Sequence, residues 1–166
     1  MENIILIGMS GAGKSTLGVL LAKSVNKKFL DTDLILQQKY GQLLQEIIYK
    51  CGLDEFKTYE EDMLLELNVD QTVIATGGSV IYSDLGMKKL KEIGRVVYIR
   101  VSYANISDRL KDISTRGIVM EKGQSLEALY REREPLYMKY ADVVIEVENE
   151  SIEETLSNII SGLNEK

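Results

Sequence analysis

The sequence predicts an α/β fold in which a five-stranded parallel sheet lies between two layers of helices, a three-layer αβα arrangement. Two observations favour this class. Short apolar segments of strand length alternate along the chain with longer segments of helical periodicity. The first apolar segment leads through a glycine-rich turn into a helix, which is the start of a βαβ unit. The 166 residues, 45% hydrophobic and 28% charged, predict a single globular domain spanning residues 1–166.

Five segments are predicted to be strands. Asn3–Ile7 reads NIILI, in which four apolar residues follow the asparagine and stop at Gly8, as expected of a strand buried on both faces of a parallel sheet. The other four predicted strands are 29–33, 73–76, 96–100 and 143–147. The segments between them are long enough to cross over the sheet, so parallel pairing is expected.

Three helices are predicted with defined ends, because apolar side chains recur in them every three or four residues. The first begins at Lys14, directly after the glycine-rich turn. The second spans 56–67, with Asp54 in position to cap its first turn. The last begins after Ser151, which is expected to form a capping box with Glu154.

A segment between two predicted helices has the character of a loop. Residues 114–124 contain two glycines and show weak periodicity, which is typical of a mobile connection. We expect residues 112–124 to form a mobile lid that carries Arg116. The only proline, Pro135, is expected to lie between the helical segments and the last strand.

The composition excludes several classes of function. Histidine is absent, which argues against Ser/His/Asp or Cys/His catalysis and against a histidine-ligated zinc site. The net charge of −6 disfavours nucleic-acid binding. The single cysteine, Cys51, is expected to pack as a small hydrophobic side chain. No apolar run has the length of a membrane span and no leader is recognisable, so we expect a cytoplasmic protein without a membrane partner. Nothing in the sequence requires more than a monomer.

The strongest motif is G-x-x-x-x-G-K-S, which Gly8 to Ser15 match as GMSGAGKS between a predicted strand and a helix. Glycines let the backbone N–H groups of such a loop turn inward around phosphate oxygens, and Lys14 then reaches the β- and γ-phosphates. Ser15 is expected to supply a hydroxyl to Mg²⁺. The alternative is a glycine turn that only joins strand to helix. The residues expected to bind the nucleotide here are Gly11, Ala12, Gly13, Lys14, Ser15 and Thr16.

A pair of acids follows in the second predicted strand, which reads FLDTD. Residues two apart on a strand point the same way, so Asp31 and Asp33 are expected to face the glycine-rich loop together. One acid would hold hydrated Mg²⁺ and the other an acceptor hydroxyl; the alternative is a polar strand end at which Asp33 caps the next helix. The strand at 73–76 does not end in an acid, so Asp31 is the carboxylate available for the metal.

The remaining motifs concern the partner of the nucleotide. The GTPase motifs N-K-x-D and D-x-x-G do not occur. Gly77 and Gly78 follow the third predicted strand, where a glycine pair lets a small ligand approach the backbone closely. The alternative for this pair is a plain loop.

Taken together, these residues resemble the shikimate kinase family over nearly the whole chain. The motifs that agree are GMSGAGKST, FLDTD, the F-x-x-x-E stretch at 56–60, TGG at 76–78, the lid arginine and REREPLY before the last strand. The resemblance implies a P-loop fold like that of nucleoside monophosphate kinases. It also implies transfer of the γ-phosphoryl group of ATP to the 3-hydroxyl of shikimate, with ATP and Mg²⁺ as cofactors and a small hydroxylated acid as substrate.

The resemblance also implies roles for single residues. The expected catalytic residues are Lys14, Asp33 and Arg116: the two cations neutralise the transferred phosphoryl group, and Asp33 orients the acceptor hydroxyl. Arg109 and Arg116 are expected on the nucleotide, and Ser15 with Asp31 on the metal. The residues expected to bind the acceptor are Asp33, Lys57, Gly77, Gly78 and Arg133.

Three positions depart from the family's pattern. Lys57 stands where the family typically has arginine, Ser79 where a third glycine is usual, and Gly117 where the lid has proline. Lysine lacks the planar fork with which arginine binds a carboxylate, and Ser79 would be strained if its position requires a positive φ. Two further hypotheses therefore stay open: a related kinase of a different hydroxylated acceptor, and an ATP-binding module without transfer activity.

Overall fold

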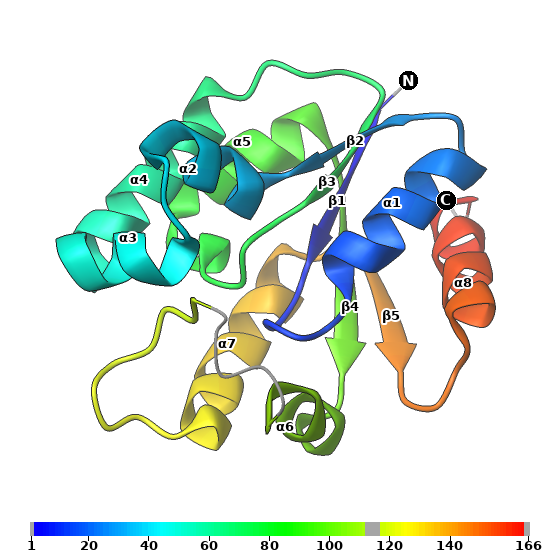
Figure 1. The fold of residues 1–166 in the computed structure, drawn as a ribbon. Helices are drawn as coiled ribbons and strands as arrows, with labels where there is room; N and C mark the ends of the chain where they lie inside the picture. Colours follow the sequence, from blue (N-terminus) through cyan, green and yellow to red (C-terminus); the bar gives the residue numbers. More distant parts are fainter. Residues whose placement is uncertain (1, 112–116, 165–166) are drawn as a thin grey trace.

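The structure, a computed structural model, describes residues 2–111 and 117–164. Its centre is a five-stranded parallel sheet with the strand order β2-β3-β1-β4-β5 (Figure 1). The strands are β1 (Asn3–Ile7), β2 (Lys28–Asp31), β3 (Thr72–Ala75), β4 (Gly94–Val101) and β5 (Val143–Val147). The predicted strands are all present, with ends shifted by two residues or fewer.

Helices cover both faces of the sheet, which confirms the predicted fold class (Figure 1). The helices are α1 (Lys14–Ser24), α2 (Thr32–Tyr40), α3 (Leu44–Cys51), α4 (Leu53–Glu66), α5 (Asp84–Ile93), α6 (Tyr103–Lys111), α7 (Leu126–Tyr140) and α8 (Ile152–Asn164), with a 3-10 turn η1 (Val80–Tyr82). On one face, α1 packs on β1, β2 and β3, and α8 packs on β5. On the other face α5 and α7 pack on β4, and α4 packs on α5.

The position of β1 explains where a site can form. All five of its side chains are buried, because β3 and β4 flank it and helices cover both faces. Since β2, β3 and β1 are neighbours and parallel, their carboxyl ends meet at one edge of the sheet. The chain segments that leave these three strands therefore start side by side, at the edge where open α/β sheets bind ligands.

The prediction for the end of β2 was wrong. The strand stops at Asp31, whose side chain accepts hydrogen bonds from the backbone N–H groups of Asp33 at 3.0 Å and Leu34 at 3.3 Å. Asp31 is thus the N-cap of α2, and Asp33 lies in the first helical turn rather than on the strand. The two acids share the sheet edge, but they do not share a strand face, and the capping residue is not Asp33.

Two expectations about helices were also wrong, and one is confirmed. Pro135 lies inside α7, which tolerates it and continues to Tyr140. The N-cap of α4 is Gly52, and Asp54 lies in the first turn of that helix. The capping box before α8 is present: the Glu154 carboxylate accepts from the Ser151 N–H at 2.7 Å, and the Ser151 hydroxyl accepts from the Glu154 N–H at 3.1 Å.

Part of the predicted lid is described. Residues 117–124 run between α6 and α7 without helix or strand, as expected for a loop. Arg116, the residue expected to act from the lid, lies outside the described residues. The mobility of the lid stays a prediction.

Candidate active site

The predicted phosphate loop connects β1 to α1 and has the backbone that its glycines allow. Gly8, Gly11 and Gly13 have φ values of 145°, 83° and 89°, which side chains rarely permit. A Cβ atom on Gly8 would also lie 2.7 Å from the Ile99 carbonyl oxygen. The loop closes with a hydrogen bond from the Ala12 N–H to the Met9 carbonyl at 3.1 Å. The glycines of the motif are thus required by backbone geometry.

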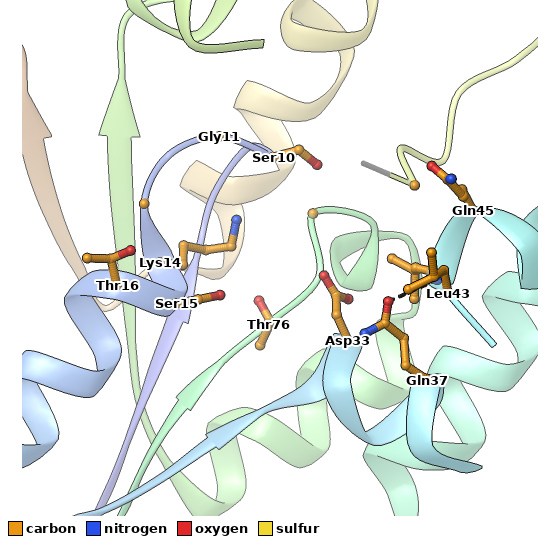
Figure 2. Close-up of a pocket in the computed structure, with 14 residues that line it drawn as sticks. Ser10, Gly11, Lys14, Ser15, Thr16, Asp33, Gln37, Leu43, Gln45 and Thr76 are labelled. Atoms are coloured by element: carbon orange, nitrogen blue, oxygen red, sulfur yellow. Dashed lines mark hydrogen bonds between the residues drawn. The ribbon is translucent and has the colours of Figure 1, made fainter. Parts of the chain in front are cut away.

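Lys14, the first residue of α1, folds back over this loop. Its ammonium group donates to the carbonyls of Gly8 at 2.7 Å and Met9 at 2.8 Å, and only 7% of the residue is exposed. Figure 2 shows its side chain reaching into the cavity that the loop borders, on the side opposite Asp33. The carbonyls of Gly8 and Met9 therefore hold the cation beside the loop, at the wall of this cavity.

Ser15 and Asp31 form a pair beside Lys14. The Ser15 hydroxyl donates to the Asp31 carboxylate at 2.5 Å. Among the described residues there is no group of three or more His, Cys, Asp or Glu side chains that could hold a metal. Magnesium needs few protein ligands, however, because phosphate oxygens and water complete its shell. A hydroxyl and a carboxylate side by side at the phosphate loop fit such an ion.

A cavity of about 500 Å³ lies on the other side of the phosphate loop. Its walls are the loop, the start of α1, Arg109 of α6 and the beginning of α8. The guanidinium of Arg109 donates to the carbonyls of Gly11 at 3.2 Å and Ala12 at 3.4 Å. Arg109, placed on the nucleotide only through the resemblance, therefore does lie against the phosphate loop.

The cavity in Figure 2, of about 300 Å³, faces the loop from the acceptor side. It brings together Lys14, Ser15, Asp33 and Gly78, all of which the sequence nominated. The lining residues that were not foreseen are Ser10, Gln37, Leu43, Leu44, Gln45 and Thr76. Apart from Ser10 and Thr76, which lie within quoted motifs, they come from α2 and the start of α3. No motif marks that region, so only the packing of α3 reveals its contribution.

A smaller recess continues from this cavity and holds most of the predicted acceptor residues. It is lined by Asp33, Gly77, Gly78 and Arg133, among others. A Cβ atom on Gly77 would lie 2.6 Å from a carboxylate oxygen of Asp33, and one on Gly78 would lie 2.8 Å from Nη1 of Arg133. The two glycines thus let these charged groups lie against the backbone, because a side chain at either position would collide with them. Arg133 is 1% exposed.

Two buried hydroxyl groups fix the glycine pair in place. Thr32 Oγ1 accepts a hydrogen bond from the Gly77 N–H at 3.0 Å. The Tyr137 hydroxyl donates to the Gly78 carbonyl at 2.6 Å, and its ring stacks on Tyr98 with centroids 5.0 Å apart. Tyr137 therefore packs on Tyr98 and also orients the backbone that borders the recess.

Glu60, the last residue of the F-x-x-x-E stretch, is a site residue for which the sequence predicted no role. It is 2% exposed, accepts a hydrogen bond from the Ser79 hydroxyl, and lies across Gly77 from Asp33. Burial raises the pKa of its carboxyl to about 8; Asp33 adds to the rise, while the Ser79 hydrogen bond and the cations Arg133 and Lys57 oppose it. A usable signal exists, because Glu60 comes one helical turn after Phe56 on the buried side of α4.

Ser79, Lys57 and Gly117, which depart from the family's pattern, each have a different structural environment. Ser79 has φ −92°, an ordinary value, so the strain considered for it is absent. Lys57 lines neighbouring cavities with Tyr82 rather than the recess, and its ammonium lies 4.7 Å from the centre of the Tyr82 ring. Gly117 lies against the start of α3, where a Cβ atom would be 2.7 Å from the Gln45 backbone nitrogen.

Comparison with known proteins agrees with this geometry. The family model "Shikimate kinase" matches residues 10–164. A shikimate kinase from Thermodesulfovibrio yellowstonii is 37% identical over 163 residues, covering 96% of this chain and 94% of the relative. One from Bacillus anthracis is 31% identical over 165 residues, covering 99% of this chain and all of the relative. The solved structure of an Acinetobacter baumannii shikimate kinase in complex with shikimate superposes with a TM-score of 0.89 and 32% identity, covering 97% of this chain and 92% of that one.

The chain belongs to the shikimate kinase family. It is accordingly an ATP-dependent phosphotransferase that acts on an alcohol group. The resemblance expected from the sequence is confirmed, and an ATP-binding module without activity is no longer a competing interpretation. Within the described residues, no helix has the length and apolar character needed to cross a membrane.

Proposed function

We propose that this shikimate kinase family member transfers the γ-phosphoryl group of ATP to the 3-hydroxyl of shikimate, giving shikimate 3-phosphate and ADP. One observation carries the proposal. The cavity of about 300 Å³ beside the phosphate loop is lined by a carboxylate, Asp33, and the small recess that continues from it holds the buried guanidinium of Arg133 next to the glycine pair. Such a cavity suits a small acceptor that presents a hydroxyl group to Asp33 and a carboxylate to Arg133. The relative from Acinetobacter baumannii binds shikimate, which supports this choice.

On the nucleotide side, the backbone of Gly11 to Thr16 cradles the phosphates and Lys14 neutralises the β- and γ-phosphoryl oxygens. The nucleoside occupies the cavity of about 500 Å³ against Arg109. Ser15 and Asp31 hold Mg²⁺, which supplies positive charge to the phosphates during transfer. We assign the whole chain to one kinase domain, with residues 112–124 as a lid that brings Arg116 to the transferred group.

On the acceptor side, Asp33 accepts a hydrogen bond from the reacting hydroxyl and takes its proton late in the transfer. Arg133, with the charge of Lys57 nearby, pairs with the acceptor's carboxylate. Gly77 and Gly78 let the ring of the acceptor approach the backbone. The acceptor oxygen is thereby aligned with the γ-phosphorus atom, so the protein contributes mainly positioning and charge.

A magnesium–ATP turnover assay with and without shikimate tests this function, with the product identified by mass spectrometry. The expected result is ADP release that depends on shikimate and a product heavier by one phosphoryl group. A panel of other hydroxy acids and nucleoside monophosphates is assayed alongside. The position of Lys57 outside the recess favours one competing candidate, a kinase of a related hydroxylated acid. Turnover with a panel member and none with shikimate would establish that alternative.

A further inference from the structure

Tyr82 contacts two cations, one of which, Arg133, lines the acceptor recess. It is the last residue of η1, which packs against both α4 and α7. The ammonium of Lys57, from α4, lies 4.7 Å from the centre of its ring. The guanidinium carbon of Arg133, from α7, lies 5.4 Å from the same centre. Both distances fall within the roughly 6 Å over which an aromatic ring attracts a cation.

The hydroxyl of Tyr82 adds polar contacts to this arrangement. It lies 3.4 Å from Nε of Arg133, from which it accepts a hydrogen bond, and it donates to the Glu132 carboxylate. A second edge of the guanidinium is also occupied, because Nη2 of Arg133 donates to the Val119 carbonyl of the lid segment. The remaining nitrogen, Nη1, is the one that faces Gly78. Together with a hydrogen bond to the Tyr137 side chain, these contacts fix the orientation of the Arg133 guanidinium.

Lys57 does not line the recess, but its positive charge acts on a residue that does. Lys57 and Arg133 both lower the pKa of Glu60, which borders the recess, against the larger effect of burial. Two cations this near one another repel, and neither is paired with a carboxylate in a salt bridge among the described residues. An aromatic ring in contact with both offsets that repulsion while leaving their positive charge available.

We propose that Tyr82 is a positioning residue for the acceptor's carboxylate: its ring holds Lys57 and its hydroxyl orients Arg133, so that the two cations act together on one anionic group. This inference rests on the proposed function. It accounts for how a lysine, which lacks the fork of arginine, serves at this position. Tyr82 itself need not touch the acceptor.

The test compares Tyr82→Leu and Tyr82→Phe with the parent enzyme by steady-state kinetics. Tyr82→Leu removes ring and hydroxyl, so we expect the KM for shikimate to rise about tenfold, with kcat and the KM for ATP changed less than twofold. Tyr82→Phe keeps the ring, and a rise of about two- to threefold is expected. Tyr49→Leu, at a tyrosine that is 92% exposed on α3, is the matched control.

A second acceptor separates positioning from general packing. In the primary amide of shikimate the carboxylate is replaced by a neutral group, so Tyr82→Leu should leave kcat/KM for the amide unchanged. An equal loss on acid and amide, or a raised KM for ATP, would overturn the proposal. If Tyr82→Leu does not fold, the same comparison with Tyr82→Phe decides.

The parent enzyme is assayed first, so the proposed function is judged separately. If it phosphorylates a different carboxylate acceptor, that acid and its amide replace shikimate in the comparison. A parent enzyme that uses only acceptors without a carboxylate would overturn both proposals.

Discussion

Ser79 and Lys57 replace residues that the family's motifs contain. Each has a partner in the structure: the Ser79 hydroxyl donates to the Glu60 carboxylate, and the Lys57 ammonium lies over the Tyr82 ring. Ser79 adopts a backbone conformation open to any residue, so it gives its hydroxyl to the buried Glu60 without backbone strain. Lys57 places its ammonium over the Tyr82 ring. At the scale of the residue, these substitutions therefore add contacts around the acceptor recess, while the phosphate loop keeps every residue of its motif.

Asp33 is predicted to be the general base that takes the proton of the acceptor hydroxyl. Asp33→Asn keeps the size of the side chain but cannot take a proton, so we expect kcat to fall by about 10²-fold or more. ATP binding, measured by calorimetry, should be unchanged. The exposed Asp62 of α4 offers a matched control as Asp62→Asn. Turnover of Asp33→Asn within a few-fold of the parent would contradict the role assigned to this carboxylate.

At the scale of elements, the lid segment, residues 117–124, contacts the start of α3. Gly117 approaches the backbone of Leu44 and Gln45 so closely that a Cβ atom would lie 2.7 Å from a backbone nitrogen and 3.0 Å from a backbone carbon. The start of α3 is itself fixed, because the Glu46 carboxylate accepts from the Leu43 N–H at 3.0 Å. Backbone atoms cannot rotate away as a side chain does, so this contact requires glycine.

Replacing Gly117 should therefore displace the lid segment from α3. For Gly117→Ala we expect kcat/KM for the acceptor to fall by about tenfold, with a small change in Tm, because the loop lies outside the sheet core. Gly123→Asn is the control in the same loop: Gly123 has φ 85°, which asparagine tolerates, and a Cβ there meets nothing within 4 Å. Equal activity in Gly117→Ala and the parent would show that the contact with α3 has no part in closure.

Nucleotide binding should also be visible in the lid segment. We expect amide hydrogen exchange in residues 117–124 to slow when ATP is saturating, because closure over the phosphates orders the loop. Exchange in α5, which lines neither the nucleotide cavity nor the acceptor recess, serves as the internal reference. Unchanged exchange in 117–124 would count against closure by this segment.

At the scale of the whole molecule, composition and burial together set the pH dependence of stability. The chain contains no histidine, so no side chain with an ordinary pKa titrates between about pH 5 and 8. Glu60 is the exception, because burial raises the pKa of its carboxyl to about 8 in the folded protein. Between about pH 4.5 and 8 the folded state therefore keeps a proton on Glu60 that the unfolded state has lost. The contribution of this group to stability is fully present below pH 4.5 and is lost as the pH rises through 8.

The free energy of unfolding is accordingly expected to fall as pH rises from about 4.5 through 8. The slope has an upper limit of about 1.4 kcal/mol per pH unit for one proton. Urea unfolding between pH 5.5 and 7.5 measures it. Glu60→Gln should flatten the curve, since the amide does not titrate, whereas Glu92→Gln, at an exposed position on α5, should leave it unchanged. Parallel curves for the parent and Glu60→Gln would exclude Glu60 as the source.

The whole fold also shows which parts of the site the sequence could and could not reveal. The phosphate loop was predictable because its glycines, lysine and serine are consecutive and their chemistry is local. The end of β2 was mispredicted, because alternation of Asp31 and Asp33 fits a strand as well as a capped helix start, and the choice depends on a hydrogen bond that Asp31 makes to its own backbone neighbours. Pro135 was predicted to lie outside a helix because proline disfavours helix interiors, yet α7 continues through it to Tyr140.

The sequence by itself determined the α/β class, the five strands, the phosphate loop and the family, because periodicity and motifs are properties of neighbouring residues. Only the tertiary structure decided which side chains meet at the acceptor recess. Ser79 and Glu60 are 19 residues apart in the chain, and Arg133 and Tyr82 are 51 apart. Their contacts follow from the strand order β2-β3-β1-β4-β5 and from the packing of α4 and α7 on η1. Such long-range packing has no counterpart in a local pattern of residues.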